Sequence, residues 1–198
     1  IIFHVDVNSA YLSWTAAEEL KNGADRDLRL IPAIIGGDQE SRHGVVLAKS
    51  LPAKKYGIRT GEPVANAIRK CPGLTIEPPD HELYREYSHK MMDFLHTYTP
   101  DIEQMSVDEC YLDFTGIAHR YGSPLEAADE IKNTIYERFG FTVNVGISCN
   151  KLLAKMASDF EKPNRVHTLF PEEIPRKMWP LPVRELHMAG RSSSQVLN

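Results

Sequence analysis

The feature that most constrains the fold is an acidic stretch near the middle of the chain, residues 105–114, which reads MSVDECYLDF. Residues 102–105 and 110–114 predict the two strands of a β-hairpin, because apolar and aromatic side chains alternate in the second. Asp108 and Glu109 lie side by side at the predicted tip, and no Lys or Arg lies within ten residues on either side. Two carboxylates about 4 Å apart repel each other by roughly 1 to 4 kcal/mol. A fold that keeps such a pair together protonates one of them or places a cation between them.

A second acidic signal lies at the start of the chain. Asp6 ends an apolar strand expected over residues 1–7, where an unpaired charge would be costly. A helix is expected to follow over residues 9–21, with Asn8 as its N-cap. Our hypothesis is that the strand end and the hairpin tip meet, and that their carboxylates together bind divalent metal. Hard oxygen ligands of this kind suit Mg²⁺, and two such ions about 3.5–4 Å apart can serve an attacking and a leaving oxygen.

Each acidic signal has a simpler explanation when it is taken alone. Asp108 and Glu109 could form a solvated hairpin tip, since Asp is common in turns. Asp6 could be no more than a partner for the dipole of the helix that follows. No histidine has metal-ligand spacing in the sequence. The hypothesis therefore depends on the combination of the acids and not on any one of them.

Charge is unevenly distributed along the chain. The formal net charge of −4 argues against a protein that simply coats nucleic acid. Residues 41–71, however, have a net charge of +6, and residues 72–140 have a net charge of −9. A basic lobe beside an acidic one suits a protein that binds a polyanionic ligand through metal ions. The alternative is a charged surface that is simply solvated.

The remaining bulk properties favour a cytoplasmic protein. The three cysteines are widely spaced and form no CxxC pair, so they indicate neither a disulfide framework nor a zinc site. No apolar run approaches 18 residues and no signal peptide is recognisable, so no membrane partner is expected. The chain lacks an initiator Met and stops at Asn198 within an expected helix, which predicts a fragment of a longer protein.

The order of the expected elements predicts an α+β fold. Without residues 9–77, the order is strand, helix, hairpin, helix, strand, which is a ferredoxin-like β-α-β-β-α-β layout with helices on one face of an antiparallel sheet. Asp80 is expected to cap a long helix that runs to about Tyr98, and the second helix covers residues 124–139 and is closed by Gly140. Residues 9–77 are then an inserted small α/β lobe, with a polar loop before Gly44.

Several basic side chains are candidates for binding an anion. Most lysines are simply solvated, but Lys162-Pro163-Asn164 directly follows a helix expected over residues 150–160, which would hold its ammonium group near a helix end. Tyr11 lies in the first turn after the first strand, where core packing is the ordinary explanation. The basic candidates are Lys54, Lys55, Arg59, Lys155 and Lys162.

Three stretches together resemble the Y-family DNA polymerases of the DinB/UmuC (DNA polymerase IV/V) type, which copy damaged templates. These stretches are HVDVNSAY at residues 4–11, SVDECYLD at residues 106–113 and VGISCNKLLAKMAS at residues 145–158. Lys162-Pro163-Asn164 follows at the family's distance. The resemblance covers about residues 1–190.

The resemblance implies a division into domains. The palm would comprise residues 1–9 and 78–165, and the fingers would comprise residues 10–77. Residues 166–198 would be the start of a helical thumb that is cut short. The little finger, which holds much of the DNA in this family, would be absent.

The resemblance also implies roles for individual residues in error-prone lesion bypass. Asp6 and Asp108 would bridge two Mg²⁺ ions, for which Mn²⁺ can substitute. Glu109 would hold the catalytic ion, and the backbone carbonyl of Val7 would be a further ligand. Tyr11 would be the steric gate that clashes with a ribose 2′-OH.

The resemblance implies the substrates and partners too. Lys54 and Lys162 would grip the triphosphate of the incoming dNTP on primer-template DNA. The primer 3′-OH would attack the α-phosphorus and release pyrophosphate. A sliding clamp would bind through the missing C-terminal region.

The sequence departs from the family pattern at four places. Asn8 stands where many members have a second Asp, and Ala10 stands where many have Phe. Residues 51–54, LPAK, replace a more usual Tyr-x-Ala-Arg, which removes a tyrosine hydroxyl and a bidentate phosphate grip. Residues 188–191, MAGR, replace the usual first Gly of the thumb hairpin.

Three other functions compete with the polymerase. A palm-fold nucleotidyl cyclase would need neither the basic lobe over residues 10–77 nor a steric gate. A phosphatase of the Asp-x-Asp type is disfavoured by Asn8. A non-catalytic DNA-binding or interaction module would not need to keep Asp6, Asp108 and Glu109 intact.

Overall fold

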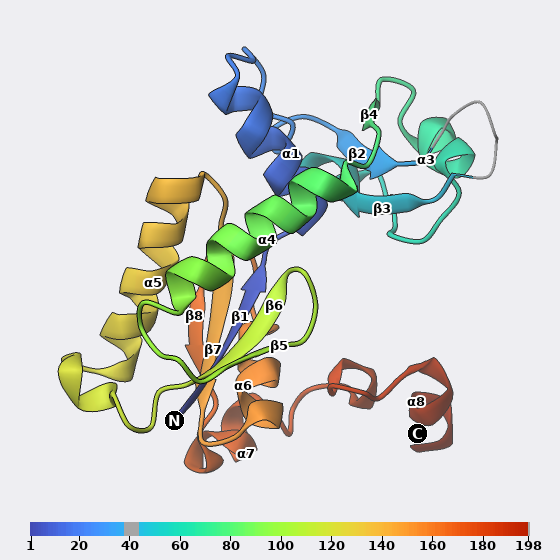
Figure 1. The fold of residues 1–198 in the computed structure, drawn as a ribbon. Helices are drawn as coiled ribbons and strands as arrows, with labels where there is room; N and C mark the ends of the chain where they lie inside the picture. Colours follow the sequence, from blue (N-terminus) through green and yellow to red (C-terminus); the bar gives the residue numbers. More distant parts are fainter. Residues whose placement is uncertain (38–43, 198) are drawn as a thin grey trace. The chain divides into compact units, whose positions relative to one another are not determined.

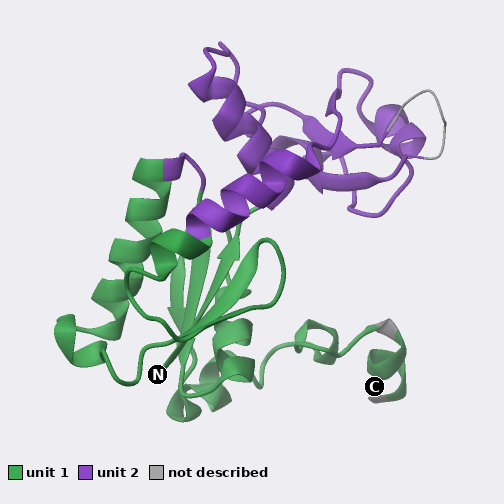
Figure 2. Cartoon of the chain, in the orientation of Figure 1, with its two compact units in different colours: residues 1–8, 92–138, 142–198 green, residues 9–91, 139–141 purple. Residues whose placement is uncertain are grey.

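The computed structural model describes residues 1–37 and 44–197. The polar loop expected before Gly44 lies outside these residues. The chain divides into two compact units, shown in different colours in Figure 2. Unit 1 comprises residues 1–8, 92–138 and 142–198, and unit 2 comprises residues 9–91 and 139–141.

A five-stranded sheet forms the centre of unit 1, with the strand order β5-β6-β1-β7-β8. Figure 1 shows the strands side by side in this order. The first four pair antiparallel, as the ferredoxin-like layout predicts. The mixed α+β fold class is confirmed. The strands are β1 (Ile2–Val7), β5 (Ile102–Gln104), β6 (Glu109–Asp113), β7 (Val143–Ser148) and β8 (Val166–Thr168).

The central strand β1 is buried on both faces, and its side chains alternate between them. Phe3 and Val5 are fully buried, and the Phe3 ring stacks on Phe114 with 4.1 Å between the ring centroids. His4 and Asp6 point to the opposite face, where α6 (Lys151–Ser158) packs on β1 and β7. One face of β1 therefore carries apolar side chains, and the other carries polar ones.

Helix α6 lies unusually close to the sheet because β7 has a glycine beneath it. A Cβ atom at Gly146 would run into the Ala154 carbonyl oxygen and the Ser158 backbone nitrogen. The Asn150 side chain caps the helix by accepting a hydrogen bond of 2.9 Å from the Leu153 N–H. After α6 the chain returns as β8, which pairs parallel with β7. The sheet is therefore mixed at this edge, because a helical crossover joins parallel neighbours.

The other helices of unit 1 are amphipathic or short. In α5 (Pro124–Phe139), Ala128, Ile131 and Ile135 are fully buried. Beyond β8, η2 (Pro171–Glu173), α7 (Ile174–Lys177), η3 (Val183–Glu185) and α8 (Arg191–Leu197) follow, and η1 (Ala118–Arg120) lies before α5. Apolar side chains from this C-terminal stretch, among them Ile174, Met178 and Leu181, pack against Met156 and Leu169.

Unit 2 is built on a three-stranded sheet with the order β3-β2-β4. The strands are β2 (Ala33–Gly36), β3 (Val46–Lys49) and β4 (Thr75–Glu77), where β2 pairs antiparallel with β3 and parallel with β4. The helices are α1 (Ala10–Lys21), α2 (Leu51–Lys55), α3 (Val64–Lys70) and the first part of α4 (His81–Leu95). Unit 2 contains the segment 9–77 that the sequence predicts as an insertion, and it also takes in residues 78–91 and 139–141. The division into palm and fingers stays a prediction.

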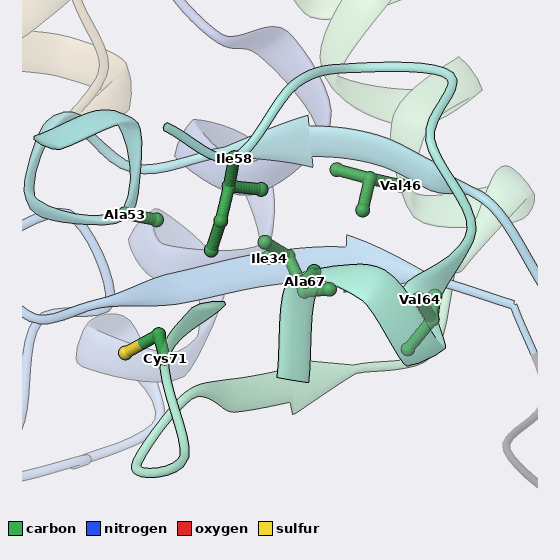
Figure 3. Close-up of a cluster of buried hydrophobic side chains, with 7 residues drawn as sticks. All are labelled: Ile34, Val46, Ala53, Ile58, Val64, Ala67 and Cys71. Atoms are coloured by element: carbon green, nitrogen blue, oxygen red, sulfur yellow. The ribbon is translucent and has the colours of Figure 1, made fainter. Parts of the chain in front are cut away.

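Two hydrophobic clusters cover the two faces of this small sheet. Ile34 belongs to one and its neighbour Ile35 to the other, as strand alternation requires. Figure 3 shows the cluster around Ile34, to which α2 and α3 contribute Ala53, Val64 and Ala67. The lobe therefore has a core of its own.

Within residues 1–37 and 44–197, no helix is both long enough and apolar enough to cross a membrane.

Candidate active site

The structure brings the separate acidic segments together at one end of the sheet. Strands β1 and β6 are antiparallel neighbours, and their register pairs Asp6 directly with Glu109. The pairing continues one residue further, where the Val7 N–H donates a hydrogen bond of 3.0 Å to the Asp108 carbonyl oxygen. The Asp6 and Glu109 side chains each place a carboxylate oxygen in one group of potential ligand atoms, which lie within 4.8 Å of one another.

A bend at the hairpin tip carries Asp108, whose carboxylate is not in that group of ligand atoms but interacts electrostatically with Asp6 and Glu109. Strand β6 begins only at Glu109, so Asp108 escapes the strict alternation of a strand. The backbone N–H groups of Met105 and Ser106 both turn toward the Glu109 carbonyl oxygen, at 3.0 and 3.3 Å. The Ser106 hydroxyl then donates a hydrogen bond of 2.6 Å to Asp108 Oδ1. This serine holds the carboxylate in place.

Two lysines from the segment 151–162 supply the positive charge that the hairpin lacks. Lys155 Nζ lies 2.7 Å from Glu109 Oε2 and 3.2 Å from Asp6 Oδ2. Lys162 Nζ lies 2.6 Å from the same Asp6 oxygen. The side chains of Lys155 and Asp6 are only 13% and 12% exposed, so their mutual attraction is screened less than at an open surface, whereas Lys162 is more exposed.

The lysines set the charge state of Asp6. Burial alone would raise the pKa of Asp6, but the ammonium groups of Lys162 and Lys155 outweigh burial and hold that pKa below its ordinary value. Conversely, burial would lower the pKa of both lysines, whereas the attraction of Asp6 raises it overall. Asp6 is therefore an ionised carboxylate at neutral pH.

Asp108 is in the opposite situation. Burial raises the pKa of Asp108, and the negative charges of Asp6 and Glu109 raise it further, against the hydrogen bond from Ser106. The three acids thus repel one another in a partly buried place, and a divalent cation would relieve that repulsion. Because the available oxygens are carboxylates, the donor set fits a hard cation such as Mg²⁺.

His4 is a member of this cluster that the sequence analysis missed. Its ring is fully buried, with Nδ1 2.8 Å from the Ser158 hydroxyl and Nε2 3.3 Å from Glu109 Oε2. Burial and the nearby charge of Lys155 lower the pKa of His4 to about 4, so the ring is neutral at pH 7. The expectation that no histidine has metal-ligand spacing is wrong for His4, which shares a ligand group with Asp6 and Glu109. The signal was its place two residues before Asp6 on one face of a strand.

Asn8 does not cap α1, and this expectation was wrong. Ser9 occupies the N-cap position in the left-handed conformation, with φ of 49° and no side-chain cap. The Asn8 side chain instead donates to Asn144 Oδ1 at 3.1 Å and accepts from the Asn164 backbone N–H at 2.9 Å. Asn144 also donates to the Glu161 carbonyl oxygen at 2.6 Å. This amide network fastens the Lys162 loop to the ends of β1 and β7.

Tyr11 lies in unit 2, on the first turn of α1. Its ring stacks on Tyr84 with 4.3 Å between centroids and 5° between planes, and His81 meets it edge-on. The side chain is half-buried, so the packing that the sequence offered as the ordinary explanation is present. A gating role for Tyr11 stays a prediction.

Lys54 also lies in unit 2, exposed on the short helix α2. Ser50 caps this helix and ties it to the sheet, because its hydroxyl accepts from the Ala53 N–H at 3.1 Å and donates to the Ile31 carbonyl oxygen at 2.7 Å. Lys54 therefore projects from a firmly held helix. Its contact with a nucleotide stays a prediction.

Comparison with known proteins supports one family. The model of the impB/mucB/samB family matches residues 5–159, which is more than half of the chain. DNA polymerase IV of Clostridium acetobutylicum is 57% identical over 198 residues, which is 100% of this chain and 50% of that protein. DNA polymerase IV of Moorella thermoacetica is 42% identical over 186 residues, 93% of this chain and 45% of that protein. The chain thus spans about half the length of these relatives.

Solved structures agree with the sequence relatives. The crystal structure of DinB from Sulfolobus solfataricus superimposes with a TM-score of 0.86 at 27% identity, covering 100% of this chain and 56% of that one. An insertion ternary complex of Dbh DNA polymerase gives a TM-score of 0.87 at 26% identity with the same coverage. The chain therefore belongs to the impB/mucB/samB family, as a Y-family domain homologous to DNA polymerase IV.

Proposed function

We propose that the protein carrying this chain is a template-directed DNA polymerase of the lesion-bypass, error-prone type. The observation that carries the proposal is the direct pairing of Asp6 with Glu109 beside Asp108, within the segment that matches the family. The substrates would be a dNTP and primer-template DNA, in keeping with the similarity to the insertion ternary complex of Dbh DNA polymerase.

Y-family DNA polymerases are in general metal-dependent nucleotidyltransferases. We propose that the metal here is a pair of Mg²⁺ ions, with Mn²⁺ as a substitute. Asp6 and Asp108 would hold both ions, and Glu109 and the Val7 carbonyl would complete the protein's share of the ligands. Bound there, the ions would supply positive charge for the attacking 3′-oxygen and for the leaving phosphate.

The chain's own residues prepare this site in three ways. The β1–β6 register pairs Asp6 with Glu109, and the lysines keep Asp6 ionised. Lys162, which the amide network holds in place, would bind oxygens of the triphosphate as pyrophosphate leaves. Lys155 would stay beside Asp6 and Glu109 and keep their carboxylates in position.

The remaining assignments follow the family. Residues 1–9 and 78–165 would be the palm, residues 10–77 the fingers and residues 166–198 the start of the thumb. Tyr11 would exclude ribonucleotides and Lys54 would contact the triphosphate. A sliding clamp is a proposed partner, and the cytoplasm is the proposed location.

A Tyr11→Ala variant tests the gate separately from the chemistry. If the ring blocks a 2′-OH, ribonucleotide incorporation should rise relative to deoxynucleotide incorporation. No rise would leave Tyr11 with a packing role on Tyr84 only.

Primer extension by the full-length protein, with Mg²⁺ and dNTPs, tests the proposed function directly. We expect extension by the unsubstituted protein, and a loss of at least about 100-fold in Asp108→Ala, because a ligand and its charge are removed. Asp101→Ala is the matched control, since Asp101 is an exposed acid just before β5, and it should extend normally. Extension that survives Asp108→Ala would refute the two-metal assignment.

Two alternative functions, a nucleotidyl cyclase and a non-catalytic module, agree less well with these observations. A nucleotidyl cyclase is disfavoured because the family match runs through the inserted lobe. A non-catalytic module is disfavoured because the three acids stand together in a partly buried place at a cost in repulsion.

A further inference from the structure

One carboxylate near the site has no role in the mechanism above. Asp159 is the C-cap residue of α6, and its side chain is 42% exposed. It lines a cavity of about 640 Å³, so solvent reaches it. The other residues that line this cavity are Met156, Phe160, Lys177, Leu181 and Glu185.

Asp159 contacts both site lysines. Its Oδ1 lies 2.9 Å from Lys162 Nζ, and its Oδ2 lies 3.7 Å from Lys155 Nζ. The same two ammonium groups contact Asp6 Oδ2, at 2.6 and 3.2 Å. Each lysine is therefore shared between a more buried carboxylate, Asp6, and a more exposed one, Asp159.

This sharing matters because the ammonium groups and a divalent metal ion would compete for the same Asp6 carboxylate. A divalent ion bound at Asp6 would repel the neighbouring ammonium groups, which would then need another anion close by. Asp159 is already in contact with both, so neither lysine would have to leave the site. Among the described residues, Asp159 is the acid that pairs with both lysines and lies outside the proposed ligand set.

We propose that Asp159 is a positioning residue, which shares the ammonium groups of Lys155 and Lys162 with Asp6 and retains them when Asp6 binds a divalent cation. The inference rests on the proposed function, because Asp6 is the proposed metal ligand. Asp159 thereby lowers the competition between lysine and metal. It also restrains Lys162, whose charge it partly neutralises.

The role predicts opposite effects on two ligands. Without the Asp159 charge, the lysines compete more strongly for Asp6, so divalent metal should bind more weakly. In the same variant Lys162 carries more uncompensated charge, so a triphosphate should bind more tightly in metal-free buffer. A general loss of structure would weaken both, so the opposite signs identify the role.

The experiment measures Mn²⁺ binding by electron paramagnetic resonance, and binding of a dNTP in EDTA by calorimetry, in the unsubstituted protein and in Asp159→Asn. For Asp159→Asn we expect a Mn²⁺ dissociation constant about three- to fivefold higher, which is the upper part of the range for an exposed ion pair because Asp159 contacts two lysines. We expect a dNTP dissociation constant lower by a similar factor. Glu161→Gln is the matched control. It removes the same charge two residues away, from a side chain that pairs with Arg165, and should change both constants by less than about twofold. Asp159→Glu keeps the charge and should bind both ligands as the unsubstituted protein does.

The outcomes separate this inference from the function on which it rests. Unsubstituted protein that binds no Mn²⁺ would overturn the proposed function itself. Normal Mn²⁺ binding that Asp159→Asn leaves unchanged would overturn only the role of Asp159. Equal weakening by Glu161→Gln would also overturn it, since general charge would then account for the effect. If Asp159→Glu lost affinity for both Mn²⁺ and the dNTP, the proposed role of Asp159 would also be overturned.

Discussion

The amide network around Asn8 allows a specific test, because many family members have Asp at this position whereas the hydrogen bonds in this structure require Asn. Here the Asn8 Nδ2 group donates to Asn144 Oδ1. Asn144 cannot turn its amide to compensate, because its own Nδ2 donates to the carbonyl oxygens of Ser158 and Glu161. Asn8→Asp would therefore set one acceptor against another in a buried place.

The magnitude follows from the lost hydrogen bond. Asn144 Oδ1 would keep the hydrogen bond of 3.2 Å from the Arg165 N–H, but it would lose the one from Asn8 and face a buried carboxylate instead. Losing a buried hydrogen bond in this way costs about 1–3 kcal/mol, so we expect Asn8→Asp to lower the free energy of unfolding by about 2 kcal/mol. For a chain of this size that corresponds to a fall in Tm of about 4–8 °C. Circular dichroism during denaturant and thermal unfolding measures both quantities. Asn133→Asp is the control, since Asn133 is exposed and accepts a hydrogen bond from Lys132, which favours an acid.

A double-mutant cycle tests the cause of the loss. In an Asn144→Ser background the serine hydroxyl can rotate and donate to the new carboxylate. Asn8→Asp should then cost about 1 kcal/mol less than it does beside Asn144. An Asn8→Asp variant within about 0.5 kcal/mol of the unsubstituted protein, or a cycle without coupling, would refute this reading of the network.

Three further predictions concern packing, pH and nucleotide binding. Gly146→Ala should cost about 3 kcal/mol or more in unfolding free energy, because a Cβ would meet backbone atoms of α6; a Tm unchanged in a thermal melt would contradict this close approach. Burial would raise the pKa of Glu173, but its hydrogen bonds to Lys177, the Phe170 N–H and Thr168 lower that pKa overall. The ionised Glu173 therefore stabilises the folded protein above the ordinary glutamate pKa, and this stabilisation is lost as pH falls through the lowered pKa. Glu173→Gln should accordingly be less stable than the unsubstituted protein at pH 7, with a gap that narrows toward pH 3 in denaturant titrations; a constant gap would count against it. Lys54→Arg should lower the KM for the incoming nucleotide by restoring a bidentate grip, and an unchanged KM in steady-state kinetics would speak against a phosphate contact.

Much of the fold could be predicted because the local signals were strong. The apolar strand before Asp6 and the alternating residues after Glu109 were enough to predict neighbouring strands, and the β1–β6 register confirms that they pair. The helix over residues 124–139 was expected with the bounds that it has, since Pro and Gly mark its two ends. Periodicity and turn residues act locally, so they can be read from sequence.

Contacts across the sheet could not be predicted in the same way. Asn8 is a residue type that favours the N-cap position and it directly precedes a helix, but its side chain forms hydrogen bonds with Asn144 and the Asn164 N–H instead. His4 looked like an interior strand residue, and only the neighbouring strand showed that it faces Glu109. The sharing of Lys155 and Lys162 with Asp159 likewise depends on how α6 packs on the sheet. No pattern within one segment carries this information.

Anomalous diffraction from crystals of the protein grown with primer-template DNA, a dNTP and Mn²⁺ tests the central claim most directly. We expect manganese peaks about 2.0–2.3 Å from carboxylate oxygens of Asp6, Asp108 and Glu109. Strong peaks at other sites, with those three carboxylates bound only to Lys155 and Lys162, would contradict it.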